Sequence, residues 1–245
     1  MSQQTSVNVG QIKAVKQELT RFMMVYKFAL DEMNTKINIL QEEFQYIHSY
    51  NPIEHTKSRL KSPESIFKKV QGKGLSPSLV SVREHIHDIA GIRISCSFIS
   101  DIYIISEMLQ QQKDIKVIEC KDYIKKAKPN GYQSLHLILE IPVFMSDREE
   151  SVKVEVQIRT VAMDFWASLE HKIYYKYQKA VPSHLLQELK EAADTAAELD
   201  RKMERIHQEV EKEKQNEEAE HHFIHLDKKA LELPQRLIQA ITDTK

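Results

Sequence analysis

The stretch Val152-Lys-Val-Glu-Val-Gln-Ile-Arg159 alternates strictly between apolar and polar residues. Because successive side chains of a β-strand point to opposite faces, this alternation predicts a strand with one apolar face for the core and one polar face. The polar face carries Lys153, Glu155, Gln157 and Arg159. A solvated surface strand could look the same, so this face indicates a functional site only if another strand supplies a chemical partner.

A second alternating stretch, His87-Asp-Ile-Ala-Gly-Ile-Arg-Ile-Ser-Cys-Ser-Phe98, supplies that partner. Its isoleucines are expected to point inward, and Asp88 comes just before the predicted strand. Asp88 and Glu155, on neighbouring strands, could share a Mg²⁺ ion, which prefers hard oxygen ligands and usually also binds substrate phosphates. The two stretches therefore predict a site built around a pair of carboxylates.

Apolar periodicity predicts long helices towards both ends of the chain. Between residues 11 and 48, and again after Pro182, apolar residues recur at spacings of three and four, which is typical of a helix. In the second helix the two spacings alternate, as in the heptad seam of a coiled coil. The seam residues are Leu185, Leu189, Ala192, Ala196, Leu199, Met203, Ile206 and Val210. We expect the seam to pack against the N-terminal helix or a neighbouring subunit, and we favour an oligomer.

Between these helices the sequence predicts an α/β (α+β) fold with a mixed β-sheet and helices on its faces. Strands are expected at residues 92–98, 116–120, 134–143 and 152–159, and helices at residues 101–111 and 160–177. Ser62-Pro63-Glu64 is typical of a helix start, and that helix should end near Gly72-Lys-Gly74. The expected organisation is an N-terminal helical region (1–50), a central domain (51–177), an oligomerisation helix (178–215) and a charged tail (216–245).

The composition limits the compartment and the partners. The 245 residues are 41% hydrophobic and 29% charged, and 35 Lys and Arg nearly balance 36 Asp and Glu. This balance gives no support for broad attraction to nucleic acid or to a membrane, so anion sites must be local. The chain shows neither a signal peptide nor a membrane span of about 20 apolar residues. We expect a soluble cytoplasmic protein in which Cys96 and Cys120 are reduced core thiols.

A first group of cations surrounds the predicted helix start. Arg59 and Lys61 precede it, and Ser65, Lys68 and Lys69 follow within the helix. Free backbone N–H groups at a helix N-terminus favour anions, so this segment resembles a phosphate site. A solvated basic helix would look similar and is the more common case.

A second group lies in residues 121–136, which contain four lysines and the aromatic Tyr132. Such a loop could hold anionic groups with its lysines and stack a base on the tyrosine. A lysine-rich surface hairpin is the alternative. His136, on the polar face of the next predicted strand, could equally be a buried, hydrogen-bonded histidine.

Three motifs occur together: His87-Asp-Ile-Ala-Gly-Ile-Arg93, Gly131-Tyr-Gln-Ser-Leu-His136 and Glu155-Val-Gln-Ile-Arg-Thr160. In combination they resemble the synthetase domain of the RelA/SpoT family of alarmone enzymes, over about residues 51–177. With the flanking helices the chain is similar to small alarmone synthetases of the RelP type, through residues 51–59 and 163–175. The resemblance implies a nucleotidyltransferase-like synthetase fold. It also implies transfer of pyrophosphate from ATP to the 3′-hydroxyl of GDP or GTP, giving ppGpp or pppGpp and AMP in the stringent response.

The resemblance implies a role for each candidate residue and suggests a homotetramer. Asp88 and Glu155 would hold Mg²⁺, and Glu155 would take the proton of the attacking hydroxyl. The ATP side would comprise Arg59, stacking on adenine, with Lys61, Ser65, Lys69 and Arg93. The acceptor side would comprise Tyr132, stacking on guanine, with Lys121 and Lys128 at the 5′-phosphates, His136 and Gln157 orienting the nucleotide, and Asp164 accepting from the base. Polyphosphate transfer suits such a set, because it depends mainly on positioning, magnesium and cations.

Other readings compete with parts of this assignment. His55 stands where product-activated relatives carry a phenylalanine, which weakens the expectation of product activation. His221, His222 and His225 have a spacing that zinc could use, but no partner ligand nearby supports a metal site. A catalytically silent scaffold is disfavoured by the retained carboxylate pair, and an enzyme acting on nucleic-acid ends is disfavoured by the near-neutral charge. No dedicated nucleic-acid site is expected.

Overall fold

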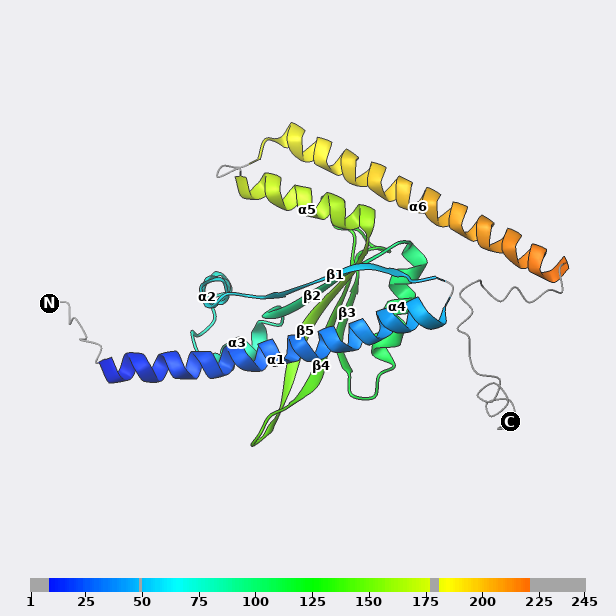
Figure 1. Ribbon diagram of the computed structural model, residues 1–245. Coiled ribbons are helices and arrows are strands. Elements are labelled where there is room, and N and C mark those ends of the chain that lie inside the picture. The colour runs from blue at the N-terminus through cyan, green and yellow to red at the C-terminus, as the bar shows by residue number, and fades with distance from the viewer. Residues whose placement is uncertain (1–8, 49, 177–180, 221–245) are drawn as a thin grey trace, which may run out of the picture. The chain divides into compact units, whose positions relative to one another are not determined.

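The computed structural model describes residues 9–48, 50–176 and 181–220. The helices of these ranges are α1 (Val9–Ile47), α2 (Pro63–Gly72), α3 (Leu79–His85), α4 (Ile99–Gln110), α5 (Val161–Lys176) and α6 (Ser183–Glu220). Their strands are β1 (Ile53–Leu60), β2 (Ala90–Cys96), β3 (Lys116–Asp122), β4 (Leu135–Phe144) and β5 (Glu149–Thr160) (Figure 1). The chain divides into two units, Met1–Glu204 and Arg205–Lys245, and all five strands lie in the first. The three histidines at 221, 222 and 225 fall outside the described residues.

The strands form one five-stranded sheet in the order β1-β2-β5-β4-β3. β2 and β5 run parallel, whereas the other neighbouring strands run antiparallel. The sheet is therefore mixed, as the sequence predicts. The parallel pair places the two stretches that define the candidate site side by side at the centre of the sheet.

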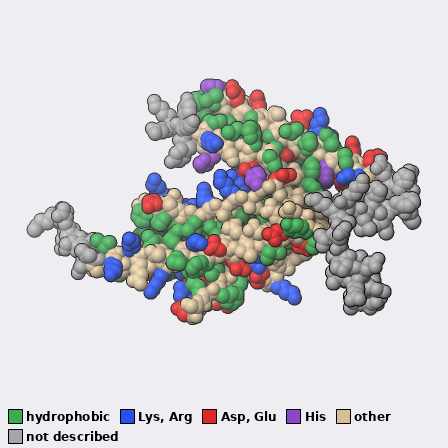
Figure 2. Space-filling model, viewed as in Figure 1, with side chains coloured by type: hydrophobic (Ala, Val, Ile, Leu, Met, Phe, Trp, Pro, Cys, Tyr) green, Lys and Arg blue, Asp and Glu red, His purple; other side chains and the backbone are tan. Residues whose placement is uncertain are grey.

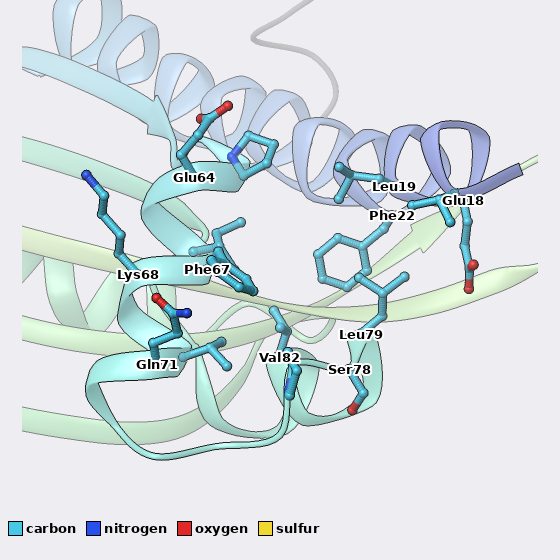
Figure 3. Close-up of a pocket in the computed structure, with 15 residues that line it drawn as sticks. Glu18, Leu19, Phe22, Glu64, Phe67, Lys68, Gln71, Ser78, Leu79 and Val82 are labelled. Carbon is cyan, nitrogen blue, oxygen red and sulfur yellow. The ribbon is translucent and has the colours of Figure 1, made fainter. Parts of the chain in front are cut away.

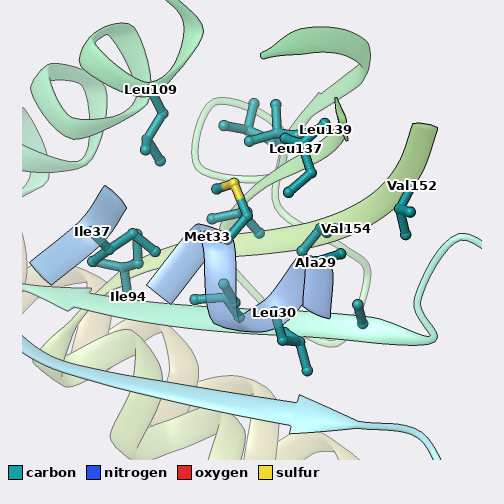
Figure 4. Close-up of a cluster of buried hydrophobic side chains, with 14 of the residues drawn as sticks. Ala29, Leu30, Met33, Ile37, Ile94, Leu109, Leu137, Leu139, Val152 and Val154 are labelled. Atoms are coloured by element: carbon teal, nitrogen blue, oxygen red, sulfur yellow. The ribbon is translucent and has the colours of Figure 1, made fainter. Parts of the chain in front are cut away.

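One face of the sheet forms the core together with α1. Val154, Val156 and Ile158 of β5 are fully buried, and so is Met33 at the middle of α1. Figure 4 shows Ala29, Met33 and Ile37 of α1 turned towards Ile94, Leu137 and Val154 of the sheet. Burying each large apolar side chain contributes about 1.5–3 kcal/mol. α1 is one continuous helix, and its central stripe fixes which face of the sheet is left for polar residues.

Two elements were not predicted from the sequence, β1 and α3. β1 pairs with β2 alone at the edge of the sheet, and after the buried Ile53 its residues are half-buried or exposed. Its alternation of apolar and polar residues is therefore weak. α3 has only seven residues and is fixed by a cap, because the Ser78 side chain accepts a hydrogen bond from the Ser81 N–H.

The start of α2 agrees with the prediction. The Ser62 side chain accepts from the Ser65 N–H, and Pro63 occupies the first helical position. The expectation of two core thiols is wrong for Cys120, which is exposed on the edge strand β3, whereas Cys96 is buried. None of the helices in the described ranges is long and apolar enough to cross a membrane.

The first part of α6 packs against α5 and the end of β5, partly through residues that lie between the predicted seam positions. Ala193 is 5% exposed and contacts a cluster with Trp166, and Asp200 accepts a hydrogen bond from Thr160 at 2.6 Å. The seam residues Leu199 and Met203 are 54% and 44% exposed. The seam residue Ala196 packs against the Trp166 cluster, so the seam and the packed face of α6 overlap there. The packing partner of the exposed seam residues stays a prediction.

Candidate active site

The strand register lines up polar side chains across the second face of the sheet. Lys57 pairs with Arg93, Arg93 with Gln157, Gln157 with His136, and His136 with Lys121. These five residues come from all five strands and form one transverse row. Directly opposed residues share a face, so the row is a continuous polar band on the side away from α1.

The neighbouring row contains the pocket. In it Arg59 pairs with Gly91, and Gly91 pairs with Glu155. Because Gly91 has no side chain, a pocket of about 250 Å³ opens between the cation and the carboxylate. Its lining consists of Lys57, Arg59, Gly91, Ile92, Arg93, Glu155 and Gln157. Figure 2 shows Lys and Arg side chains gathered along the hollow between α5 and the sheet.

Asp88 stands immediately before β2 and binds two lysines of the basic segment. Its Oδ2 forms ion pairs with Lys61 and, at 2.7 Å, with Lys69. Burial alone would raise the pKa of Asp88, but the hydrogen bonds from the two lysines outweigh it and hold the pKa below its usual value. Asp88 is therefore ionised at neutral pH, and its buried Oδ1 has no hydrogen-bond partner within the described ranges.

Glu155 has a polar partner on each carboxylate oxygen. Gln157 Nε2 donates to Oε2 at 3.0 Å, and His136 Nδ1 lies 3.7 Å from Oε1. Burial would raise the pKa of Glu155, but the interactions with His136 and Gln157 lower it below its usual value, against an opposing effect of the Asp88 charge. Glu155 is thus a half-buried, ionised carboxylate beside the pocket.

Asp88 and Glu155 are the residues of the site that could hold a magnesium ion. Asp88 offers its unpartnered Oδ1, and Glu155 interacts electrostatically with Asp88. Within the described ranges no group of three or more His, Cys, Asp or Glu side chains is placed to hold a metal. A site with two carboxylates suits Mg²⁺, which takes its remaining ligands from water and substrate phosphates, better than it suits a structural zinc ion.

Tyr132 lies beside the polar band, next to His136. Its hydroxyl is 2.7 Å from His136 Nε2 and accepts a hydrogen bond from Arg159 Nη2 at 2.5 Å. The Lys128 ammonium lies 4.8 Å from the centre of the tyrosine ring, and the Arg159 guanidinium lies 5.0 Å from it. The structure thus brings together three residues of the predicted acceptor side, Tyr132, Lys128 and His136.

Asp164, at the start of α5, contacts residues from both the predicted ATP side and the predicted acceptor side. Arg93 Nη1 lies 3.0 Å from its Oδ1, and Arg159 Nη1 lies 3.1 Å from the same oxygen. His55 Nε2 is 3.9 Å from Oδ2. Arg93, expected on the ATP side, therefore touches both the pocket and the acceptor-side carboxylate.

Two predicted residues lie at the rim of this arrangement. Ser65, in the first turn of α2, is exposed and accepts a hydrogen bond from the Ser62 hydroxyl at 3.0 Å. Lys121 is exposed on β3 and donates to Glu119 at 2.8 Å, while its backbone pairs with His136. Within the described residues, neither Ser65 nor Lys121 forms a hydrogen bond with Asp88 or Glu155.

Three residues of the site were missed from the sequence: Lys57, Gly91 and Arg159. Gly91 and Arg159 stand inside the quoted motifs, and the alternation places Arg159 on the face of Glu155. Lys57 could not be placed without β1. Arg159 is 3% exposed and contacts four polar side chains, so its burial is the feature that the sequence did not reveal.

A second pocket lies elsewhere, between α1, α2 and α3. It measures about 640 Å³, and Phe22, Phe67 and Leu79 turn towards it (Figure 3). Its walls are mainly apolar, and its charged lining residues are Glu18, Glu64 and one lysine, Lys68. The smaller pocket beside Glu155 is therefore the candidate active site.

Comparisons with known proteins found a matching family and similar sequences. Residues 58–180 match the family model described as a region found in RelA / SpoT proteins. The chain is 54% identical over 204 residues to GTP pyrophosphokinase YwaC of Bacillus subtilis (strain 168), covering 83% of this chain and 97% of that protein.

Two solved structures are also similar. The crystal structure of small alarmone synthetase 2 from Bacillus subtilis shares 55% identity and a TM-score of 0.72, covering 78% of this chain and 99% of the other. The structure of small alarmone synthetase 1 from Bacillus subtilis bound to its product pppGpp shares 37% identity and a TM-score of 0.74, covering 79% and 98%.

Proposed function

The chain belongs to the RelA/SpoT family and is a GTP pyrophosphokinase that makes (p)ppGpp, and from this premise we propose that the pocket beside Glu155 is where the transfer takes place. In the reaction the 3′-oxygen of GDP or GTP forms a bond to the β-phosphorus of ATP. The bond between that phosphorus and the bridging oxygen of the α-phosphate breaks, and AMP leaves. The observation that carries the proposal is the ionised Glu155 facing Gly91 and Arg59 across a pocket with Asp88 nearby.

Glu155 is the proposed base. Its lowered pKa keeps it ionised at neutral pH, so it can accept the proton of the 3′-hydroxyl as the new bond forms. Gln157 and His136 hold the two carboxylate oxygens in place. A base in a fixed orientation contributes through positioning, which is the main means of catalysis in phosphoryl transfer.

The donor side is proposed to lie over β1 and the start of α2. Arg59 is exposed at the pocket and can stack on adenine, while Lys61, Lys69 and Arg93 supply positive charge for the polyphosphate. Ser65 would donate to a phosphate at the N-terminus of α2, where backbone N–H groups also favour anions.

The acceptor side is proposed to lie over β3, β4 and α5. A guanine base stacking on Tyr132 would displace Lys128, which is exposed, from the ring, whereas Arg159 is buried. The displaced Lys128 and the exposed Lys121 would then meet the 5′-phosphates. Asp164, at 17% side-chain exposure, would accept from the base.

Magnesium would be held by Asp88 and Glu155 and would neutralise charge on the transferred phosphates. Replacing Asp88 by Asn should raise the magnesium concentration needed for activity, because one anionic ligand is lost. A titration of activity with Mg²⁺ measures this. An unchanged requirement would remove Asp88 from the proposed metal site.

Incubation of the purified protein with ATP, Mg²⁺ and GDP or GTP tests the reaction. We expect AMP and the guanosine 3′-pyrophosphate in equal amounts after separation by charge. Formation of ADP in place of AMP would contradict pyrophosphate transfer. A catalytically inactive protein with the same fold would give no product.

We also propose that the enzyme is a cytoplasmic homotetramer assembled through the exposed apolar stripe of α6. Leu199, Met203, Ile206 and Val210 are 54%, 44%, 44% and 45% exposed. A stripe of this kind on an otherwise charged helix favours burial against a neighbouring subunit. Both substrates are nucleotides of the cytoplasm, which supports that compartment.

A further inference from the structure

Arg159, near the end of β5, donates hydrogen bonds to four polar side chains in and around the candidate site. It is 3% exposed, and its Nη2 donates to the Tyr132 hydroxyl at 2.5 Å and to Gln157 Oε1 at 2.7 Å. Nη1 donates to Asp164 at 3.1 Å, and Nε donates to the Ser134 hydroxyl at 3.4 Å. A guanidinium group can only donate, so the direction of each of these bonds is fixed.

The first bond of Nη2 starts a relay that reaches one oxygen of Glu155. Arg159 donates to one lone pair of the Tyr132 oxygen, which favours donation of the phenolic proton to His136 Nε2, 2.7 Å away. A neutral His136 that accepts at Nε2 carries its proton on Nδ1. Nδ1 is the nitrogen that faces Glu155 Oε1, at 3.7 Å.

The second bond of Nη2 starts a relay to the other oxygen. An amide side chain can adopt two orientations that exchange its oxygen and nitrogen. Since Arg159 donates to Gln157 Oε1, the amide nitrogen must point the other way, and it donates to Glu155 Oε2 at 3.0 Å. In this arrangement the two hydrogens of one Arg159 nitrogen favour defined proton positions on both sides of the carboxylate.

We propose that Arg159 is a positioning residue for the transfer reaction, which orients Glu155 through one relay over Tyr132 and His136 and a second relay over Gln157. This rests on the proposed function for the role of Glu155 as base. Arg159 touches neither reacting atom, so it acts through its neighbours. Because Tyr132 belongs to both the acceptor side and the first relay, the same arginine links acceptor binding to the orientation of the base.

Kinetics of Arg159→Lys test the proposal. Lysine keeps the buried charge beside Asp164, which also retains Arg93 at 3.0 Å, but it cannot reproduce the fork that serves Tyr132 and Gln157 together. We expect kcat to fall about tenfold or more, with the KM for ATP within about twofold of the wild type. Arg83→Lys is the matched control, because Arg83 is exposed and pairs with Glu150 outside the site.

Tyr132→Phe provides a second variant that keeps the ring and cuts only the first relay. Its kcat should fall with little change in the KM for the guanine nucleotide. Arg159→Lys should then cost less in the Tyr132→Phe background than in the wild type, because one of its two routes is already broken. If the two substitutions lower kcat independently, so that their fold-changes multiply in the double variant, the relay is overturned. A normal kcat in a folded Arg159→Lys enzyme would also overturn it.

The His136 tautomer gives a readout that does not depend on activity. In protein labelled with ¹⁵N-histidine, with His136→Gln to assign the signal, we expect the proton on Nδ1 in the wild type. Tyr132→Phe and Arg159→Lys should both shift it towards Nε2. A proton on Nε2 in the wild type would overturn the inference, whereas a wild type that makes no product but keeps the Nδ1 proton would overturn only the proposed function.

Discussion

Gly91 lies opposite Glu155 in the parallel pair of β2 and β5, and the pocket occupies the space that a side chain there would fill. A Cβ at this position would have its nearest contact at 3.8 Å, with the Arg59 carbonyl oxygen, which is ordinary van der Waals distance. The backbone there has no positive φ. The conformation of the strand therefore does not require a glycine here, and we propose that Gly91 leaves room for a ligand in the pocket.

Replacing Gly91 by Val should fill the pocket while the sheet stays folded. Valine suits a β-strand, so we expect an unchanged or slightly higher Tm together with a loss of activity of more than about tenfold, seen first in the KM for ATP. Gly91→Ala, with one carbon, should have a smaller effect. Normal ATP affinity in Gly91→Val, measured by calorimetry, would place the donor elsewhere.

Replacing Tyr132 by Ala should raise the KM for the guanine nucleotide far more than the KM for ATP. Stacking of a base on an aromatic ring is worth about 1–3 kcal/mol, roughly fivefold to 150-fold in affinity. Arg59→Ala should do the reverse, because Arg59 lines the pocket on the donor side. If Tyr132→Ala affects ATP more strongly, the two nucleotide sites have been exchanged.

At the scale of single residues, the sequence could identify those whose chemistry stands out. Asp88, Glu155, Lys61 and Lys69 occur in motifs with the right side chains, and the structure brings Asp88 and the two lysines into contact. Arg159 could not be assigned, because its role depends on burial and on partners from β4 and α5. The dual contacts of Arg93 likewise follow from the fold of α5 over the sheet.

At the scale of elements, α6 packs closely against the loop before β4. A Cβ on Gly131 would lie 2.4 Å from the Ala193 Cβ of α6, which is far too close. The same glycine has a φ of +86°, a backbone conformation that residues with a side chain rarely adopt. The loop that carries Tyr132 is thus pressed against the helix proposed to build the oligomer.

Replacing Gly131 by Ala should reduce stability and weaken binding of the guanine nucleotide. The positive φ costs about 1–2 kcal/mol, and the contact with Ala193 should add about 1–3 kcal/mol. Denaturant unfolding and the KM for GDP measure the two effects.

Gly74→Ala is the matched control, because Gly74 has a φ of +65° but nothing within 4 Å of its added Cβ. It should show the cost of the conformation alone. The double variant Gly131→Ala with Ala193→Gly should recover part of the loss. Equal losses in Gly131→Ala and Gly74→Ala would show that α6 does not constrain the loop.

The elements with strong apolar periodicity could be predicted from the sequence, and those fixed by their neighbours could not. The core stripe of α1 and the alternation in β5 reflect burial that the pattern records directly. β1 has only one neighbouring strand and exposes Glu54, His55 and Lys57, so no alternation marks it. α3 depends on a local cap, and a segment of seven residues is too short to show a clear helical periodicity in the sequence.

At the scale of the whole molecule, the exposed stripe of α6 predicts self-association. Replacing both Leu199 and Ile206 by Lys should give smaller, poorly active species in sedimentation. These side chains are 54% and 44% exposed in the single chain, so the subunit itself should remain folded. Circular dichroism verifies the folding.

Glu198→Lys is a suitable control, because it changes an exposed residue of the same helix outside the stripe. It should leave the assembly intact. A wild-type protein that sediments as a monomer at micromolar concentration would contradict the assembly. The same size in wild type and the double variant would place the interface elsewhere.

The most direct test of the proposed site follows the γ-phosphate of labelled ATP in the wild type and in Glu155→Gln. The label should appear in the guanine nucleotide, with one AMP released per transfer, and Glu155→Gln should slow this step by about 10²–10⁴-fold while remaining folded. Glu149→Gln, an exposed position on the same strand, should transfer at the normal rate. Wild-type rates in Glu155→Gln would contradict the proposal, because they would show that Glu155 is not the base of the transfer.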